Sequence, residues 1–151
     1  MILNQQHEVR VGKRPLESFL RRVKRELGIN QSDVTVCLVS DKVMARLNQN
    51  FRRKKGPTDV LSFPAIARQK RARLRRKSAT ANSANREYLG DIAISPSTAR
   101  RYAKKNNRPL PSELRVLILH GVLHLLGYDH EIDRGEMDKI EQKLRKRFGL
   151  A

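Results

Sequence analysis

The sequence predicts an α+β protein: one domain, residues 1–151, in which a small mixed β-sheet is surrounded by helices. Segments with apolar residues at helical spacing alternate with short runs rich in β-branched residues, and glycines or prolines separate most of them. The chain length and the 38% share of hydrophobic residues suit one domain with a sizeable core. Because Trp is absent and aromatic residues make up 5%, that core must consist mainly of Leu, Ile and Val.

Strands and helices are expected to alternate along the first half of the chain. The expected elements are a short edge strand at 2–6, a helix from Pro15 to about Leu27, a strand at 34–39, a helix from Asp41 to about Asn50 and a strand at 59–63. Pro15 suits the first position of a helix, and Gly28 suits its end. The run at 34–39 is rich in valine, which is typical of a buried strand. Either Ser40 or Asp41 can cap the helix that follows.

The second half is expected to contain one strand and three helices. They are a strand at 88–95, a helix from Pro96 to about Lys105, a helix at 114–126 and a final helix at 135–148. The segment 114–126 is apolar almost all round, which indicates a buried helix, and Gly127 is expected to end it. The final helix is amphipathic, with one apolar face formed by Met137, Ile140, Leu144 and Phe148.

Residues 68–86 differ from the rest of the chain in composition. They contain no acidic residue and these basic ones: Arg68, Lys70, Arg71, Arg73, Arg75, Arg76, Lys77 and Arg86. Residues 78–85 are small and polar, so the whole segment is expected to be a flexible basic loop. Four of its arginines are predicted to bind substrate phosphates without reading bases, namely Arg71, Arg73, Arg75 and Arg76.

The formal net charge of +18 and the pI of about 11.1 predict a polyanionic partner. Nucleic acid is favoured, because each neutralised phosphate releases condensed counterions. Anionic lipid is the alternative, but no apolar run approaches the roughly 20 residues that span a bilayer, and no signal peptide is expected at the N-terminus. Cys37 is the single cysteine, which excludes an internal disulfide and is consistent with a cytoplasmic location.

Three of the four histidines lie within eleven residues: His120, His124 and His130. His120 and His124 are four residues apart on the expected buried helix, so they project from the same face. Gly127 permits a positive φ, so the chain can turn back and bring His130 toward the other two. Three imidazoles can hold one Zn²⁺ and leave a fourth position open for water, as in catalytic zinc sites.

A histidine on an apolar helix is often an ordinary, satisfied core residue. Three of them at this spacing would each carry a desolvation penalty unless they share a partner, which favours a metal site. The spacing is also that of metzincin proteases, which carry a glutamate directly after the first histidine as general base. Gly121 occupies that position here, which counts against peptide hydrolysis.

The sequence resembles the YbeY family of bacterial endoribonucleases, which are ribosomal RNA maturation factors. The matching segments are HGVLHLLGYDH at 120–130, LNxxFR at 47–52, PTDVLSFP at 57–64 and LGDIAIS at 89–95. They extend in order from about residue 33 to the end of the chain. The segment 68–86 departs from the resemblance, because it is longer and more basic than is usual in the family.

The resemblance implies a central four-stranded sheet with about five surrounding helices and a zincin-like metal helix. It implies one zinc ion, or alternatively nickel, held by His120, His124 and His130. It also implies single-strand-specific RNA cleavage in ribosomal RNA processing, including maturation of the 3′ end of the small-subunit RNA, and in ribosome quality control. Partners would then be ribosomal RNA precursor and the ribosome or proteins of its small subunit; the sequence does not fix an oligomeric state.

Arg52 and His120 are the predicted catalytic residues. The metal would lower the pKa of bound water or polarise a phosphoryl oxygen, while Arg52 would bind the scissile phosphate and stabilise its charge. The assignment of Arg52 rests on the resemblance, because residue type alone does not distinguish it from the other Lys and Arg residues, 33 in all. Asp129 and Glu131 are candidates to orient a histidine or accept a proton, or else they are ordinary surface acids.

Two other functions fit parts of the pattern. One is a zinc metalloprotease-like hydrolase, supported by the histidine spacing and opposed by Gly121 and the charge. The other is a non-catalytic ribosome-assembly factor in which the metal is structural. The sequence shows no aromatic-interleaved platform for stacking single-stranded bases, so specificity is expected to come from RNA shape or a protein partner.

Overall fold

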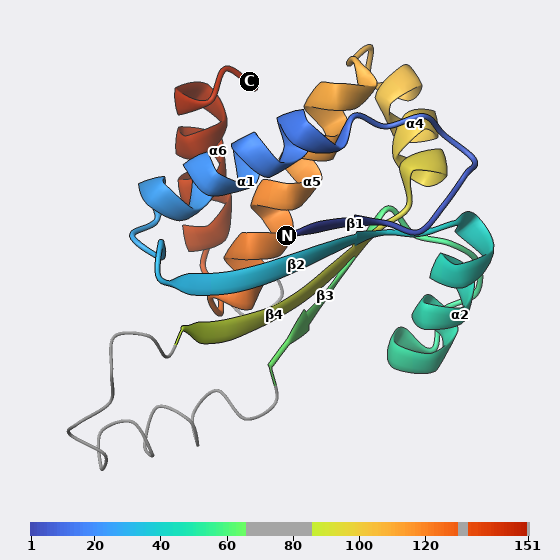
Figure 1. The fold of residues 1–151 in the computed structure, drawn as a ribbon, viewed down its shortest axis with the longest axis horizontal. Helices are drawn as coiled ribbons and strands as arrows, with labels where there is room; N and C mark the ends of the chain where they lie inside the picture. The colour runs from blue at the N-terminus through green and yellow to red at the C-terminus, as the bar shows by residue number, and fades with distance from the viewer. Residues whose placement is uncertain (66–85, 130–132, 151) are drawn as a thin grey trace.

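The computed structural model describes residues 1–65, 86–129 and 133–150. They form an α+β arrangement of one four-stranded sheet and five helices, as expected (Figure 1). The strands are β1 (Ile2–Asn4), β2 (Ser32–Leu38), β3 (Val60–Pro64) and β4 (Glu87–Ile94). The helices are α1 (Lys13–Glu26), α2 (Asp41–Arg52), α4 (Pro96–Lys105), α5 (Leu110–Leu125) and α6 (Glu136–Arg147).

The sheet is mixed, with strand order β1-β2-β4-β3. β1 pairs parallel to β2, β2 pairs parallel to β4, and β3 pairs antiparallel to β4. β1 and β3 are therefore the two edge strands, and the expectation of an edge strand at the N-terminus is confirmed over residues 2–4. The antiparallel pair aligns Pro64 with Gly90, so the end of β3 lies beside the start of β4.

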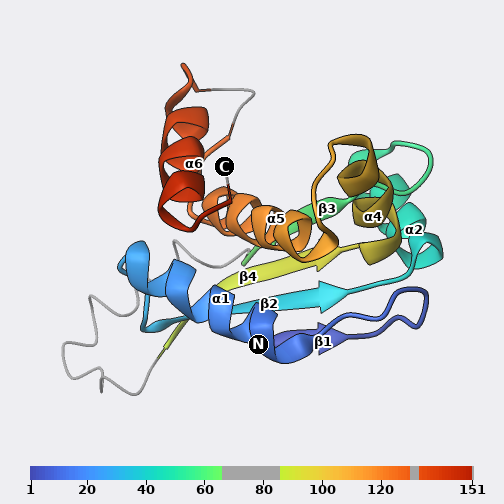
Figure 2. The ribbon, with the colours of Figure 1, turned by 90° about the horizontal axis from the view of Figure 1, so that it is seen from above.

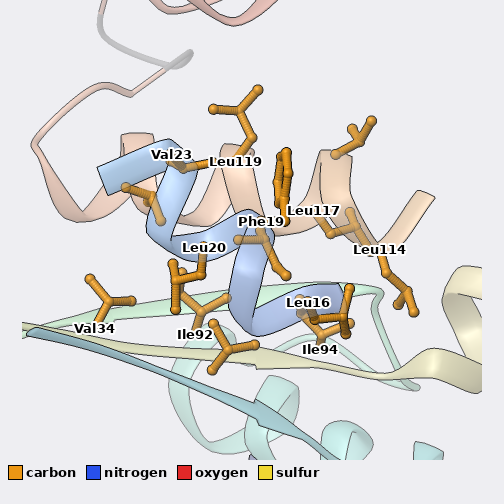
Figure 3. Packing of buried hydrophobic residues seen from close by; sticks show 14 of the residues in the cluster. Leu16, Phe19, Leu20, Val23, Val34, Ile92, Ile94, Leu114, Leu117 and Leu119 are labelled. Atoms are coloured by element: carbon orange, nitrogen blue, oxygen red, sulfur yellow. The ribbon is translucent and has the colours of Figure 1, made fainter. Parts of the chain in front are cut away.

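One face of the sheet is covered by α1 and α5, with α6 packed against α5, and α2 lies on the opposite face (Figure 1). Viewed from above, α1 lies on the side of β1 and β2, and α5 lies on the side of β4 and β3 (Figure 2). Leucine, isoleucine, valine and phenylalanine side chains fill the space between α1, α5 and the sheet (Figure 3). Ten of the 16 residues of α5 are buried, so the prediction of a buried helix is confirmed.

The opposite face of the sheet carries a second, smaller core under α2. Its buried members are Val39, Met44, Leu61 and Ala93, and Phe63 packs against them. The alternation along β4 explains the two cores: Ile92 and Ile94 point to α5, and Ala93 points to α2. The two helices that end near the candidate site, α2 and α5, thus lie on opposite faces of the same sheet.

Several predicted boundaries move by a few residues. α1 begins at Lys13, so Pro15 is its third residue and not its first, a position where its missing N–H is still not needed. α5 begins at Leu110, four residues before the expected start, with Pro111 in its first turn. The sequence pattern did not reveal this turn, because prolines such as Pro109 and Pro111 also mark junctions between elements. A proline inside the first turn removes no helical hydrogen bond, so the helix tolerates it.

The start of α2 is held by a network of polar side chains. Ser40 caps the helix by accepting a hydrogen bond from the N–H of Val43 at 3.2 Å, as the sequence predicted for Ser40 or Asp41. Asp41 accepts hydrogen bonds from Ser95 Oγ at 2.6 Å and from Thr98 Oγ1 at 2.7 Å. Arg101 of α4 adds an ion pair to Asp41 at 2.9 Å. This network joins α2 to the start of α4.

Most of the predicted basic loop at 68–86 lies outside the described residues, and so do Arg71, Arg73, Arg75 and Arg76. Arg86, its last residue, is described. Its guanidinium contacts Asp33 Oδ1 at 2.8 Å and the carbonyl oxygen of Asn30 at 2.9 Å, which ties the start of β4 to the start of β2. Among the described residues, no helix combines the length and the apolar character that crossing a bilayer would require.

Candidate active site

His120 and His124 lie on the last two turns of α5, on the same face of the helix. Their Nε2 atoms are 3.0 Å apart, and the two ring planes meet at 73° with centroids 4.6 Å apart. Both side chains are half-buried. The two imidazoles thus lie side by side, as their four-residue spacing on a helix predicted, and the convergence of three imidazoles on one cation stays a prediction.

The chain leaves α5 through Gly127, whose φ is +100°. This left-handed conformation suits glycine, and it ends the helix where the sequence predicted. The third predicted ligand, His130, lies outside the described residues, as does Glu131. Within the ranges that are described, no group of three or more His, Cys, Asp and Glu side chains forms a candidate metal cluster.

Glu141 of α6 contacts Nδ1 of His120, the ring nitrogen that faces away from His124. Its Oε1 lies 3.0 Å from Nδ1 of His120, and the glutamate residue is only 7% exposed. Two acceptors do not face each other at this distance, so the contact favours a proton on Nδ1 of His120. A neutral imidazole protonated there presents its lone pair at Nε2, toward His124.

The donor set fits a cation such as zinc. Two imidazole nitrogens at 3.0 Å require either a proton or a cation between them. Zn²⁺ holds imidazole nitrogens at about 2.0–2.1 Å in a tetrahedral site, which places two of them roughly 3.3 Å apart. A histidine ligand commonly donates its second N–H to a carboxylate, which is the arrangement of His120 and Glu141.

An open cleft of about 860 Å³ lies beside the two histidines. Its lining residues are Phe51, Arg52, Thr58, Asp59, Val60, Leu61, Ser62, Phe63, Pro64, His120, His124, Gly127, Tyr128 and Asp129. The cleft thus follows the edge strand β3, with the end of α2 on one side and the end of α5 on the other. A sheet edge bounded by two helix ends is accessible to an extended chain of substrate.

Arg52, the last residue of α2, lines the same cleft as His120 and His124. The helix ends there because Arg53 adopts a left-handed conformation, with φ of 54°. The buried Asn48 closes the following turn, since its amide donates to the carbonyl oxygen of Gly56 at 2.9 Å. Arg52 is exposed, so its guanidinium is accessible to a phosphate in the cleft.

Gly121, which stands where metzincin proteases have glutamate, is buried against β4. A Cβ atom at this position would lie 2.8 Å from two side-chain carbons of Ile92. The carbonyl oxygen of Gly121 also accepts a hydrogen bond from Ser62 Oγ of β3 at 3.3 Å. The position therefore faces the sheet, and a glutamate there has no room.

Cys37 does not belong to this site. It is half-buried on β2, away from the cleft lining. Burial, and then the negative charge of Asp91, raise the pKa of its thiol above the usual value. A thiol with a raised pKa is protonated at neutral pH, which is the opposite of what a cysteine nucleophile needs.

Sequence reasoning found some of the site residues and missed others. Asp129, predicted as a candidate acid, lines the cleft. Glu141 was missed, although a glutamate on the apolar face that also carries Met137 and Leu144 was a signal for a buried partner. Phe51 belongs to the segment LNxxFR but was not predicted as a site residue, because its place in the cleft depends on how α2 packs against β3.

Comparison with known proteins matches almost the whole chain to one family. The family model described as endoribonuclease YbeY matches residues 1–149. Endoribonuclease YbeY of Koribacter versatilis is 40% identical over 150 residues, covering 99% of this chain and 86% of the relative. That of Aquifex aeolicus is 35% identical over 133 residues, covering 88% and 79%. The solution structure of TM1509 from Thermotoga maritima matches with a TM-score of 0.61 and 28% identity, covering 99% of this chain and 90% of that one.

These likenesses extend over almost the whole chain, and the named relatives are enzymes that cut RNA internally. The chain is thus a member of an endoribonuclease class. Within that class it belongs to the YbeY family, as the segments around Arg52 and the histidines indicated.

Proposed function

We propose that this protein is a metal-dependent endoribonuclease that cleaves single-stranded RNA in ribosomal RNA processing. The observation that carries the proposal is the pair of Nε2 atoms of His120 and His124, 3.0 Å apart in a cleft that also contains Arg52. Family membership supports RNA as the substrate, and the net charge of +18 supports a polyanionic partner.

His120 and His124, with His130, would hold one zinc ion, and nickel is the alternative. When bound, the metal would supply Lewis acidity toward a phosphoryl oxygen or lower the pKa of a water molecule. Glu141 would keep Nδ1 of His120 protonated and thereby keep Nε2 available as a ligand. The hydrogen bond from Ser62 to Gly121 holds the ligand-bearing turn of α5 against β3.

Arg52 would bind the scissile phosphate. Its guanidinium is always protonated, and its planar fork matches two phosphate oxygens. Attack on phosphorus builds negative charge on the equatorial oxygens of the phosphate. The guanidinium of Arg52 would stabilise that charge. His120 would act as a metal ligand. Its catalytic role would be to hold the metal beside the phosphate that Arg52 binds.

Ribosomal RNA precursor, met on the ribosome or its small-subunit proteins, is the proposed substrate context. The arginines at 71, 73, 75 and 76 would add sequence-independent phosphate contacts. A cytoplasmic location belongs to the same proposal. The protease alternative is disfavoured by the packing of Gly121 against Ile92, which leaves no room for the general base.

The test combines elemental analysis with cleavage of an unstructured RNA. We expect the purified protein to contain about one metal ion per molecule. His124→Ala should lose both the metal and cleavage. Arg52→Ala should keep the metal and lower kcat by about 10²–10³-fold, the usual cost of removing one group that stabilises transition-state charge.

Arg46→Ala is the matched control, because Arg46 is exposed on the same helix but does not line the cleft. It should cleave as the wild type does. Activity that survives in His124→Ala and in the chelated wild type would refute metal dependence, and if that activity comes from a trace contaminant it would favour the non-catalytic assembly factor. Cleavage by Arg52→Ala at the wild-type rate would refute the role of Arg52.

A further inference from the structure

Phe51 is an apolar side chain that the fold leaves in solvent. It is 65% exposed, whereas Phe19 is buried and the other two phenylalanines are half-buried. Isolated exposed apolar residues are common on protein surfaces, so exposure alone carries no meaning. Phe51, however, lines the cleft that contains the two histidines, and Arg52 follows it in the chain.

The ring of Phe51 is held in place by a second ring. Phe63 of β3 lies with its centroid 5.0 Å away and its plane at 71°, an edge-to-face contact. Phe63 is itself packed against the small core under α2. The exposed ring is therefore oriented by the interior of the protein, and ordering it on binding a ligand costs little additional entropy.

The residues that follow Phe51 in the chain are basic and favour an anionic ligand. Residues 52–55 are Arg, Arg, Lys and Lys, all exposed. No acidic residue occurs between Asp41 and Asp59. A flat apolar ring beside a run of cations matches the alternation of base and phosphate along a nucleic-acid strand, and stacking on aromatic rings is how proteins commonly bind unpaired bases.

We propose that Phe51 is a stacking platform for one unpaired RNA base next to the scissile phosphate. The inference deepens the proposed function, on which it rests for the identity of the substrate. A base within a duplex has both faces covered by its neighbours, so it cannot stack on a side chain without leaving the helix. Phe51 would thus give the enzyme its preference for single strands. The sequence did not predict this stacking platform, because Phe51 and Phe63 come together only when α2 packs on the sheet.

The test measures binding apart from cleavage, using protein as purified. The probes are a short unstructured RNA analogue that resists cleavage, with 2′-O-methyl and phosphorothioate groups, the same strand with abasic positions, and a duplex of equal length. The variants are Phe51→Leu, which keeps an apolar side chain, and Phe51→Trp, which keeps an aromatic one. Tyr102→Leu is the matched control, since Tyr102 is 44% exposed and does not line the cleft.

Phe51→Leu should weaken binding of the intact single strand about tenfold, while Phe51→Trp and Tyr102→Leu should match the wild type. The wild type should lose a similar factor on the abasic strand, and Phe51→Leu should not distinguish the two strands. Duplex binding should be the same for all variants. Unchanged binding of the single strand by Phe51→Leu would overturn the proposal and point to a protein partner for this ring. An equal loss on the duplex would also overturn it.

Cleavage of ordinary RNA by the same wild-type preparation separates this inference from the proposed function. Binding that depends on Phe51 without any cleavage would support the stacking platform and refute the nuclease. Cleavage together with binding that is independent of Phe51 would support the nuclease and refute the stacking platform.

Discussion

At the residue scale, the contact between His120 and Glu141 joins two consecutive helices through partly buried polar side chains. The imidazole comes from α5 and the carboxylate from α6. The glutamate is buried, and Arg145, one turn further along α6, lies 3.9 Å from the same oxygen. A buried charged group held by several partners has little freedom to move, so it fixes the rotation of the imidazole ring.

Replacement of Glu141 should weaken metal binding more than it changes the fold. Glu141→Ala is expected to lower the affinity for zinc by about 10–100-fold, because Nδ1 of His120 loses the group that holds its proton. Glu141→Gln should lose less, since its amide oxygen still accepts that proton. Competition against a chelator of known affinity measures the change.

Gln142→Ala is the control for this prediction, because residue 142 is exposed on the same helix. It should bind zinc as the wild type does. Equal zinc affinity in Glu141→Ala and the wild type would show that the carboxylate does not support the ligand. Circular dichroism of both variants checks that α6 is intact.

The sequence could predict those site residues whose relative positions follow from their spacing within one helix. His120, His124 and Gly127 form a spaced pattern within one helix and its exit, so their geometry followed from helical periodicity. Glu141 and Phe51 act through tertiary contacts, and no local spacing relates them to the histidines. Their positions could be found only from the packing of α6 on α5 and of α2 on β3.

At the element scale, the position of α2 depends on the network around Asp41. This helix carries Phe51 and Arg52 at its far end, so any loosening of its start changes where those side chains lie. Burial alone would raise the pKa of Asp41. The hydrogen bonds from Ser95, Thr98 and Arg101, together with the charge of Arg101, outweigh burial and lower its pKa below the usual value.

Asp41→Asn should destabilise the protein by about 1–2 kcal/mol at pH 7, because the charged hydrogen bonds are removed. A carboxyl group whose pKa is lowered by folding stabilises the native state above its unfolded pKa, and that contribution is lost as the pH falls through the folded value. The difference between Asp41→Asn and the wild type should therefore stay constant from pH 7 to about 5 and shrink as the pH falls below about 4. Urea unfolding at each pH measures it.

Asp33→Asn provides the comparison, since Asp33 pairs with Arg86 at an exposed site. Exposed pairs contribute little, so this variant should differ from the wild type by less than about 1 kcal/mol at every pH. If Asp41→Asn is also indistinguishable from the wild type at pH 7, the network does not hold α2.

The elements themselves were largely predictable. α4 has the expected bounds, and the burial of α5 followed from its uniform apolar composition. The start of α5 was missed because proline signals both a junction and the first turn of a helix, and only the backbone distinguishes the two. The pairing order β1-β2-β4-β3 was not predicted, because strand neighbours depend on contacts between distant segments.

At the scale of the whole molecule, basic charge is concentrated in the segment 66–85, which joins the described part of β3 to that of β4. The N–H of Ala65 donates to the carbonyl oxygen of Leu89 at 3.0 Å, and Pro64 aligns with Gly90. Ala65, which precedes the segment 66–85, thus lies opposite Leu89, and Arg86, which follows the segment, lies three residues before Leu89. Three residues opposite 86–88, followed by a two-residue Asn-Gly turn, would join the strands in this register.

Replacement of residues 66–85 by such a five-residue linker should leave the fold intact and weaken RNA binding. The change removes seven basic residues and no acidic one, which lowers the net charge from +18 to +11. The slope of log affinity against log salt should decrease by about 0.7 for each phosphate that the protein no longer neutralises. Binding to single-stranded RNA across a salt series measures it, and thermal unfolding checks the fold.

A second variant, with Arg71, Arg73, Arg75 and Arg76 changed to glutamine, separates charge from the deletion. It should reproduce part of the decrease in slope. A deletion variant with the wild-type affinity and salt dependence would show that the segment does not bind RNA.

The glycine after the first histidine has a consequence for protein design. Gly121 lets α5 approach β4 closely, and both imidazoles are carried by that helix. A designer who introduced a larger residue there, for example to import a peptidase base, would push the helix away from the strand. His120 and His124 would shift together, so converting this scaffold would require rebuilding the sheet surface at Ile92 first.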